Sequence, residues 1–192
     1  MGLSELRRQL PDEVLIKGFL AGESHCFDIL YARYKKQLYS YLNRLLPGQH
    51  TLADDVFQHT WMKVIPQLPK YTNQERFLAW IMRIAHNVAI DHLRKGKRQE
   101  TPVEIGDDHD EILKDQAEPW REMARDELEK ALEWALTQLA PELREVFLLR
   151  QEDIGFKEIA EIQDCSINTA LGRMQYALKN LRRLLSIWKG EG

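Results

Sequence analysis

The sequence predicts an all-α fold made of two small helical domains joined by a flexible acidic linker. Apolar residues recur at steps of three and four along nearly all of the 192 residues, and no convincing stretch alternates apolar with polar residues as a strand does. Proline and glycine interrupt this pattern at intervals suited to helix ends. Hydrophobic residues make up 44% of the chain, which is enough for packed cores and too much for a disordered chain.

Prolines mark where several helices are expected to begin and end. Pro11 precedes the first predicted helix, Pro47 follows the second, and Pro66 closes the third. Pro141 opens a helix in the second half of the chain, where its missing N–H costs no hydrogen bond. The predicted helices span residues 12–21, 24–46, 52–65, 75–95, 121–139, 141–150, 155–163 and 167–188.

The net charge of −3 conceals changes of sign along the chain. Six basic residues and one acid between positions 76 and 98 give +5, three basic residues and eleven acids between 100 and 127 give −8, and five basic residues and one acid from 166 onward give +4. The acidic stretch 100–119, with little apolar periodicity, is typical of a flexible linker, and an acidic loop within one domain is the alternative. We expect domains at 8–98 and 121–188, joined by a linker at 99–120.

No pattern in the sequence predicts an enzyme, a cofactor or a metal site. Cys26 and Cys165 lie far apart and outside any Cys/His cluster with metal-ligand spacing, so we expect neither a zinc site nor a disulfide. No HExxH motif, glycine-rich phosphate loop or Gly-x-Ser-x-Gly turn occurs, and no catalytic residues are predicted. The apolar runs are too short to span a membrane and the first residues do not resemble a signal peptide, which favours a cytoplasmic protein without membrane insertion.

Residues 156–188 predict a helix-turn-helix. A short first helix has an apolar face, and Ser166 at the end of a three-residue turn is a good N-cap for the second helix. The second helix is expected to bury Ile167, Leu171, Met174, Leu178, Leu181 and Leu185. Its other side carries amide, hydroxyl and cationic groups suited to base edges and phosphates, namely Asn168, Thr169, Arg173, Gln175, Tyr176 and Lys179. The alternative is an ordinary pair of antiparallel helices.

The predicted helix 75–95 combines an apolar face with a basic aromatic stripe. Its core positions are Phe77, Ile81, Ile84 and Val88. The stripe carries Arg76, Trp80, Arg83, Asn87 and Arg94 and continues into Lys95, Lys97 and Arg98. Positive charge follows a phosphate backbone, and an exposed ring can stack on an unpaired base, which favours single-strand binding. The alternative for Trp80 is a place in the core.

The predicted helix 52–65 carries an acidic outer face. Phe57, Trp61, Val64 and Ile65 are expected to point inward, whereas Asp54, Asp55, Gln58 and Met62 point outward with His59 beside them. Adjacent aspartates diverge on a helix and no second ligand pair is visible, so the face suits protein docking better than metal or acid–base chemistry. The alternative is that the two aspartates stabilise the start of the helix.

Three collinear segments, at 52–61, 76–94 and 139–150 followed by the helix-turn-helix, resemble the extracytoplasmic-function sigma factors of the sigma-70 family. The resemblance covers nearly the whole chain in the family's order and spacing. It implies a subunit of bacterial RNA polymerase that recognises the −10 and −35 elements of promoters and assists DNA melting.

The resemblance also implies partners and site residues. The partners are core RNA polymerase, contacted at the β′ clamp coiled coil and the β flap, promoter DNA, and an anti-sigma factor. The residues implied in core polymerase binding are Asp54, Asp55, Gln58, His59 and Met62. Those implied in −10 binding are Arg76, Trp80, Arg83, His86, Asn87, Arg94, Lys95, Lys97 and Arg98. Those implied in −35 binding are Ser166, Asn168, Thr169, Arg173, Gln175, Tyr176 and Lys179.

Two features depart from the family's pattern. His59 stands where the family usually has an acid, and the recognition helix has only Arg173 and Lys179 as nearby basic residues. We therefore expect −35 binding with a weak electrostatic component or a different target sequence. The alternative function is a stand-alone helix-turn-helix regulator of duplex DNA, which has no need of a single-strand surface. A scaffold protein would leave both basic segments unexplained.

Overall fold

Helices account for nearly all of the residues that the computed structural model describes, which are 10–72, 76–97 and 124–190. In order they are α2 (Asp12–Leu20), α3 (Ser24–Leu45), α4 (His50–Gln67), the 3₁₀ helix η1 (Leu68–Lys70), α5 (Phe77–Lys97), α6 (Arg125–Gln138), α7 (Pro141–Gln151), α8 (Phe156–Ile162) and α9 (Ile167–Gly190). No strand occurs within these ranges, and the all-α class is confirmed. The predicted linker at 99–120 lies outside the described residues. None of the described helices is long and apolar enough to cross a membrane.

The predicted helices are confirmed, with ends that differ by a few residues. The clearest difference is at α4, which continues through Pro66 to Gln67 instead of ending at 65. A proline in the last turn removes few hydrogen bonds, because little helix follows it, so the chain tightens into η1 rather than breaking. Gly22 and Gly48, with φ of 98° and 75°, supply the left-handed backbone that the turns after α2 and α3 require.

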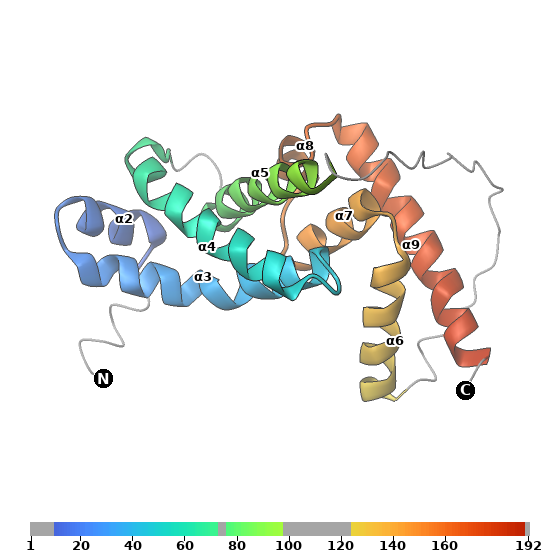
Figure 1. Cartoon of the computed structure of the whole chain (residues 1–192). Coiled ribbons are helices and arrows are strands. Elements are labelled where there is room, and N and C mark those ends of the chain that lie inside the picture. The colour runs from blue at the N-terminus through green and yellow to red at the C-terminus, as the bar shows by residue number, and fades with distance from the viewer. Residues whose placement is uncertain (1–9, 73–75, 98–123, 191–192) are drawn as a thin grey trace.

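The two halves of the chain pack directly against each other (Figure 1). Helices α2 to α5 form the first half and α6 to α9 the second, and the contacts between them run from α3 to α7 and from α5 to α8. At the far end of the second half, α6 and α9 lie side by side, with the rings of Trp134 and Trp188 5.4 Å apart. The structure is therefore one closed arrangement of two helical units.

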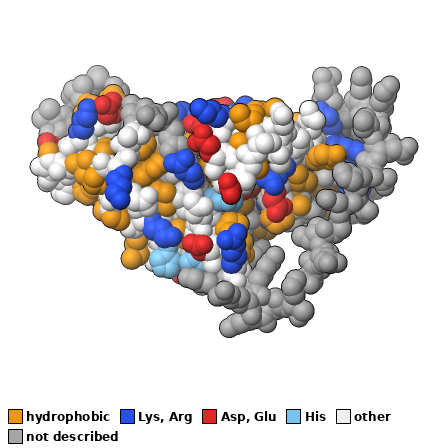
Figure 2. Space-filling model, turned by 90° about the horizontal axis from the view of Figure 1, so that it is seen from above, with side chains coloured by type: hydrophobic (Ala, Val, Ile, Leu, Met, Phe, Trp, Pro, Cys, Tyr) orange, Lys and Arg blue, Asp and Glu red, His pale blue; other side chains and the backbone are white. Residues whose placement is uncertain are grey.

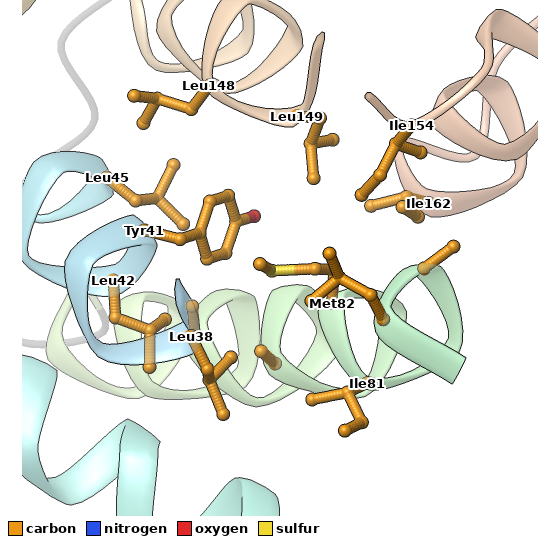
Figure 3. Packing of buried hydrophobic residues seen from close by; sticks show 14 of the residues in the cluster. Leu38, Tyr41, Leu42, Leu45, Ile81, Met82, Leu148, Leu149, Ile154 and Ile162 are labelled. Atoms are coloured by element: carbon orange, nitrogen blue, oxygen red, sulfur yellow. The ribbon is translucent and has the colours of Figure 1, made fainter. Parts of the chain in front are cut away.

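An apolar core continues from the first half into the second (Figure 3). It joins Leu38, Tyr41, Leu42 and Leu45 of α3 and Ile81 and Met82 of α5 to Leu148, Leu149, Ile154 and Ile162 of the second half. Leu38, Leu42, Leu149 and Ile154 are completely inaccessible to solvent. Each fully buried side chain of this kind contributes about 1.5–3 kcal/mol to folding, and the contacts of this core across the two halves favour the closed arrangement.

An aromatic cluster fixes α4 on α3 and thereby sets which face of α4 is exposed. The ring of Trp61 lies 4.9 Å from that of Tyr31 and 5.8 Å from that of Phe27, and Phe57 packs against Tyr31 at 6.3 Å. Ile65, which was expected to point inward, is 41% exposed. The reason is that Ile65 lies on the same side of α4 as the exposed Met62, three residues earlier, whereas Val64 and Leu68 face the core.

The buried face of α9 differs from the predicted one at its first turns. Ile167 and Leu171 are 47% and 39% exposed, whereas Ala170 and Ala177 are completely buried. Helix α9 packs against α7, α8 and α6 at once. Small side chains at these positions let the backbones approach closely, so alanine rather than a larger apolar residue marks the contact. The apolar pattern alone does not distinguish these two cases.

Ala177→Leu is expected to destabilise the second half by about 1–3 kcal/mol, because the added atoms have no space between α9 and its neighbours. The free energy of unfolding in urea measures the effect. Leu171→Ala serves as the control, since an exposed leucine is expected to change stability by no more than about 0.5 kcal/mol. Equal effects of the two substitutions would show that the packing of α9 is assigned to the wrong face.

Candidate functional site

The predicted docking residues form one exposed face on α4. Asp54, Asp55, Gln58, His59 and Met62 are all exposed, and Met62 is 68% exposed. Ala53, Val56 and Thr60, on the opposite side of the helix, are completely buried. Because α4 begins at His50, both aspartates lie beyond its first turn, so stabilisation of the helix start does not explain them.

Hydrogen bonds orient two members of this face. The hydroxyl of Tyr39 donates to Asp54 Oδ1 at 2.9 Å, and the Tyr39 ring packs on Phe57 at 5.5 Å. His59 Nδ1 lies 3.1 Å from His92 Nε2 of α5. A rigid helix therefore presents an acidic, partly apolar surface whose side chains are held from behind, which is an arrangement suited to binding a protein partner.

Trp80 requires a correction, because it lies in the core and not on an exposed stripe. It is 7% exposed, and its ring packs 5.1 Å from Tyr71 and 5.4 Å from Phe77. Helix α5 lies beneath neighbours on several sides, so residues beyond the predicted apolar face are buried as well, including Leu78, Ala79, Met82, Ala85 and Ala89. In this structure Trp80 cannot stack on a base.

The other predicted −10 residues separate into two groups. Asn87 and Arg94 are exposed. Arg76, Arg83 and His86 instead contact the second half of the protein. Lys95 and Lys97 have side chains outside the described part of the structure, and Arg98 lies outside it altogether. Figure 2, which views the molecule from above, shows Lys and Arg side chains interspersed with acidic ones over the described residues, and no continuous basic patch in that view.

Two arginines of α5 and its preceding turn bind the helix-turn-helix. Arg83 Nη1 lies 3.6 Å from Glu161 Oε2 on α8. Arg76 donates a hydrogen bond to the backbone carbonyl oxygen of Asp153, in the turn before α8. Both arginines were predicted to contact DNA, so the closed arrangement occupies part of the predicted −10 surface with residues of the second half.

A buried carboxylate on α7 connects the two halves. Glu145, which is 4% exposed, accepts hydrogen bonds from the Tyr41 hydroxyl at 2.6 Å and from Gln163 Nε2 at 2.9 Å, and His86 Nδ1 lies 2.7 Å from it. Gln163 in turn accepts a hydrogen bond from Arg173 of α9 at 2.9 Å. We call Glu145, Tyr41, His86 and Gln163 the Glu145 cluster. It links a predicted −10 residue to a predicted −35 residue.

A second buried charge, Arg144, closes the same interface. Its guanidinium donates to the carbonyl oxygens of Leu136, Thr137 and Leu139 at 2.7–3.1 Å, and also to that of Leu45 at 2.9 Å. These carbonyls belong to the end of α6 and the end of α3, where helix carbonyls lack partners and cations are favoured. Arg144 therefore joins the two halves at their helix ends, although its burial lowers its pKa.

Sequence reasoning did not single out Arg144 and Glu145 as site residues. Their partners lie as far as 104 residues away in the chain, so neither spacing nor periodicity identifies them. Charged residues are almost never fully buried unless they are paired. The sequence does show two adjacent charged residues inside the apolar pattern of 143–149, which indicates buried charges. It does not indicate which residues pair with them.

The Glu145 cluster predicts a pH dependence of stability. Burial raises the pKa of Glu145, but the hydrogen bond and charge of His86, with hydrogen bonds from Tyr41 and Gln163, lower it by more, so the pKa lies below the usual range. Burial and the neighbouring Glu145 raise the pKa of Tyr41 well above 10.0. A carboxyl group whose pKa is lowered in the folded state stabilises the fold at pH values above its unfolded-state pKa, which is about 4.3. This contribution is lost as the pH falls through the lowered pKa of the folded state. A raised tyrosine pKa gives stability that is lost as the pH rises past about 10.

We therefore expect the contribution of Glu145 to be lost as the pH falls below about 4.3 and that of Tyr41 to be lost as the pH rises past about 10. Urea unfolding from about pH 3 to about pH 11 measures both declines. Tyr41→Phe should flatten the alkaline decline, and Glu145→Gln the acidic one. If each variant followed the wild-type pH curve, displaced by a constant amount, the cluster would not be the titrating element.

The predicted helix-turn-helix is present in the structure, with its recognition helix capped as expected. Ser166 Oγ accepts a hydrogen bond from the Thr169 backbone N–H at 3.0 Å. Asn168, Thr169, Gln175 and Tyr176 are exposed along the first half of α9, and Tyr176 is 52% exposed. Arg173 and Lys179 are only half-buried, and Arg173 is engaged with Gln163. The exposed polar groups are those that read base edges or bind phosphates.

Comparison with known proteins identifies both halves. The family model described as Sigma-70 region 2 matches residues 30–99, and the one described as Sigma-70, region 4 matches residues 129–181. The RNA polymerase sigma-H factor of Pseudomonas aeruginosa is 28% identical over 184 residues, which cover 92% of this chain and 95% of that protein. The ECF RNA polymerase sigma-E factor of Escherichia coli K12 is 27% identical over 176 residues, which cover 88% of this chain and 91% of that protein.

Two solved structures share the fold. The sigma factor RpoE, in complex with the anti-sigma factor NepR from Bartonella quintana, has a TM-score of 0.63 at 22% identity, covering 84% of this chain and 97% of its own. CnrH, in complex with the cytosolic domain of CnrY, has a TM-score of 0.63 at 24% identity, covering 92% and 97%.

Two helical units, one with an exposed acidic helix face and one with a capped helix-turn-helix, define a two-domain transcription initiation factor. The chain belongs to the sigma-70 family, as an extracytoplasmic-function sigma factor. It binds RNA polymerase and directs initiation at specific promoters, and we refer to its two halves as domain 2 and domain 4.

Proposed function

We propose that this sigma factor makes its three functional contacts through three separate surfaces. The face of α4 that carries Asp54, Asp55 and Gln58 docks on the β′ clamp coiled coil of core polymerase. The observation that supports this role is the exposure of an acidic face on a helix whose other side is fixed by the aromatic cluster. Met62, at 68% exposed, gives the same surface an apolar anchor.

The DNA contacts divide between α5 and α9. Asn87 and Arg94 are exposed on α5 and bind the melted −10 element, together with the basic residues that follow. Asn168, Thr169 and Gln175 lie on the exposed side of α9 and enter the major groove of the −35 element, with the β flap holding domain 4 nearby. Few cations stand beside these groups, so we expect −35 binding to depend weakly on salt.

The closed arrangement is proposed as the state of the free protein, which has to open on polymerase. Helix α5 directly contacts α8 of the helix-turn-helix. Positions −10 and −35 are about 25 base pairs apart, or roughly 85 Å along duplex DNA at about 3.4 Å per base pair. Two helices in contact cannot reach both elements at once. Residues 98–123 join the halves, and a fully extended segment of that length reaches roughly 90 Å, which permits the separation.

Closure also restrains DNA binding at the residue level. Arg83 and Arg76 are paired with Glu161 and the carbonyl of Asp153, and Arg173 with Gln163. Opening frees these three side chains for phosphates and bases.

We further propose that the protein works in the cytoplasm under the control of an anti-sigma factor, because the structurally similar RpoE and CnrH were solved with NepR and CnrY. We also propose that it catalyses no reaction of its own.

The experiment that tests this function is co-purification with bacterial core polymerase followed by transcription from a promoter library. We expect a stable complex that initiates at a defined set of promoters containing both elements. A stand-alone regulator of duplex DNA would instead bind promoter DNA without polymerase and fail to co-purify with core. Failure to bind core polymerase would refute the proposal.

Asn87→Ala is expected to impair promoter melting while leaving core binding unchanged. Asn87 is exposed on the face of α5 assigned to the −10 element, and losing the hydrogen bonds of its amide to a base costs about 1–3 kcal/mol. Permanganate reactivity of unpaired thymines in the open complex reports the effect. Asn43→Ala, a change of the same type at a partly exposed site on α3, is the control. Normal melting by Asn87→Ala would remove this residue from the −10 surface.

A further inference from the structure

We propose that Glu23, His25 and Cys26 form a binding site for a divalent metal ion, best suited to Zn²⁺, at the start of α3. The site lies at the turn between α2 and α3, at the opposite end of domain 2 from the Glu145 cluster (Figure 1). Among the residues that the structure describes, the donor atoms of these three side chains come within 4.8 Å of one another. Thiolate, imidazole and carboxylate are the ligand types that Zn²⁺ uses in proteins.

The distances between the donor atoms match a tetrahedral site. His25 Nε2 lies 3.5 Å from Glu23 Oε2 and 3.6 Å from Cys26 Sγ, and Cys26 Sγ lies 3.8 Å from Glu23 Oε2. Zinc bonds of about 2.0–2.3 Å at tetrahedral angles place such donor pairs roughly 3.3–3.6 Å apart. The same three atoms therefore define three corners of a nearly tetrahedral site, and shifts of a few tenths of an ångström complete it.

A glycine leaves the space that the sulfur occupies. Cys26 is 6% exposed, and a Cβ at position 18 would lie 2.6 Å from its Sγ, which is closer than real contacts allow. Gly18 lies inside α2, where glycine is less favourable than alanine. The packing of α2 on α3 thus requires a glycine at position 18, because the Cys26 thiol occupies the space of a Cβ there. This packing holds the thiol, the softest of the three ligands, beside Glu23 and His25.

Solvent can reach the site, and there is room for a fourth ligand. An open pocket of about 340 Å³ borders it, and Glu23, His25 and Cys26 are part of its lining. The side chains of His25 and Glu23 are 42% and 57% exposed, so an ion can arrive without unfolding. Three protein ligands leave one tetrahedral position for water. Binding releases the thiol proton of Cys26 to solvent, because only the thiolate ligates the metal.

This site could not be predicted from the sequence, since residues 23, 25 and 26 do not have the spacing of a Cys/His metal motif. The three side chains converge because Glu23 precedes the first turn of α3 with φ and ψ of −83° and 84°, so it leaves the helical path and its carboxylate lies beside the two residues of that turn. A carboxylate from outside the helix thus supplies the third protein ligand, beside His25 and Cys26.

The metal-free full-length chain, titrated with Zn²⁺ against a chromophoric chelator, tests the proposal. We expect one equivalent to bind, and His25→Gln and Cys26→Ser each to weaken the affinity at least tenfold. Cys165→Ser is the matched control and should bind as the wild type does. With Co²⁺ as the probe, a thiolate-to-metal charge-transfer band is expected in the wild type and in Cys165→Ser, and its loss in Cys26→Ser.

The His25→Gln variant should fold normally, because the His25 side chain is partly exposed. The circular dichroism spectrum of this variant should equal that of the wild type, which separates loss of metal binding from loss of folding. Two results would overturn the proposal. One is wild-type affinity in both His25→Gln and Cys26→Ser. The other is loss of the bound equivalent in His59→Gln instead, which would assign the metal to the His59–His92 pair. The measurement needs no polymerase, so its outcome is separate from that of the proposed promoter function.

Discussion

Glu145→Ala is expected to separate domain 2 from domain 4. The substitution leaves the Tyr41 hydroxyl, the Gln163 amide and the His86 imidazole without their shared acceptor in a buried place. Removing one partner of a buried charged group costs about 3–5 kcal/mol, and two of the three donors belong to domain 2. Much of the loss therefore falls on the interface between the domains.

Small-angle scattering and hydrogen exchange measure this opening. The radius of gyration of the free chain should increase, and amides at the ends of α3 and α7 should exchange faster. Glu142→Ala, an exposed glutamate one turn earlier on α7, is the control. His86→Ala removes only a domain 2 donor and so opens the interface without disturbing the fold of domain 4. An unchanged radius of gyration in both Glu145→Ala and His86→Ala would contradict the role of the cluster.

Opening is also expected to change the affinity for polymerase. A protein whose binding-competent form is only partly populated binds more weakly by that fraction. If core polymerase binds the open form, Glu145→Ala and His86→Ala should bind it more tightly than the wild type. Weaker binding by the open variants would show that polymerase recognises the closed form.

Asp55→Arg is expected to weaken binding to core polymerase by about ten- to a hundredfold, or about 1.4–2.8 kcal/mol. Asp55 is exposed at the centre of the acidic face of α4, and the reversal places a positive charge against a partner surface selected by negative charge. The stability of the free protein should change by less than about 0.5 kcal/mol, since the residue is exposed.

Binding of labelled core polymerase measures the effect. Glu127→Arg makes the same change of charge at an exposed site on α6 and should bind normally. If both reversals weakened binding equally, the net charge of the protein rather than the α4 face would be responsible. If neither did, the docking face would lie elsewhere.

Helix positions could be predicted from the sequence because they depend on local signals. Apolar periodicity, Pro141 at the start of α7 and the Ser166 cap of α9 all act within one or two turns. The exposed acidic residues of α4 and the polar residues at the start of α9 follow from the same periodicity, because the solvent-facing side of a helix is a local property.

The remaining features depend on which elements pack together, and so the sequence could not supply them. Trp80 is buried because α5 has neighbours on several sides. Ile167 and Leu171 are exposed because α9 turns the side that carries Ala170 and Ala177 toward its neighbours. Glu145 is buried because Tyr41 and His86 come from the other domain. The closed arrangement as a whole rests on such long-range contacts, for which charge patterns along the chain carry no information.

The distance between the two domains, measured in the free chain and on polymerase, shows whether the protein opens when it binds. Donor and acceptor fluorophores at Thr51 of α4 and Ile187 of α9, both exposed and attached through azide-bearing amino acids, leave the native cysteines in place. Energy transfer should be high in the free chain and fall when core polymerase binds, and His86→Ala should lower it without polymerase. High energy transfer that persists in a complex actively transcribing a promoter would contradict the claim that this sigma factor opens to work.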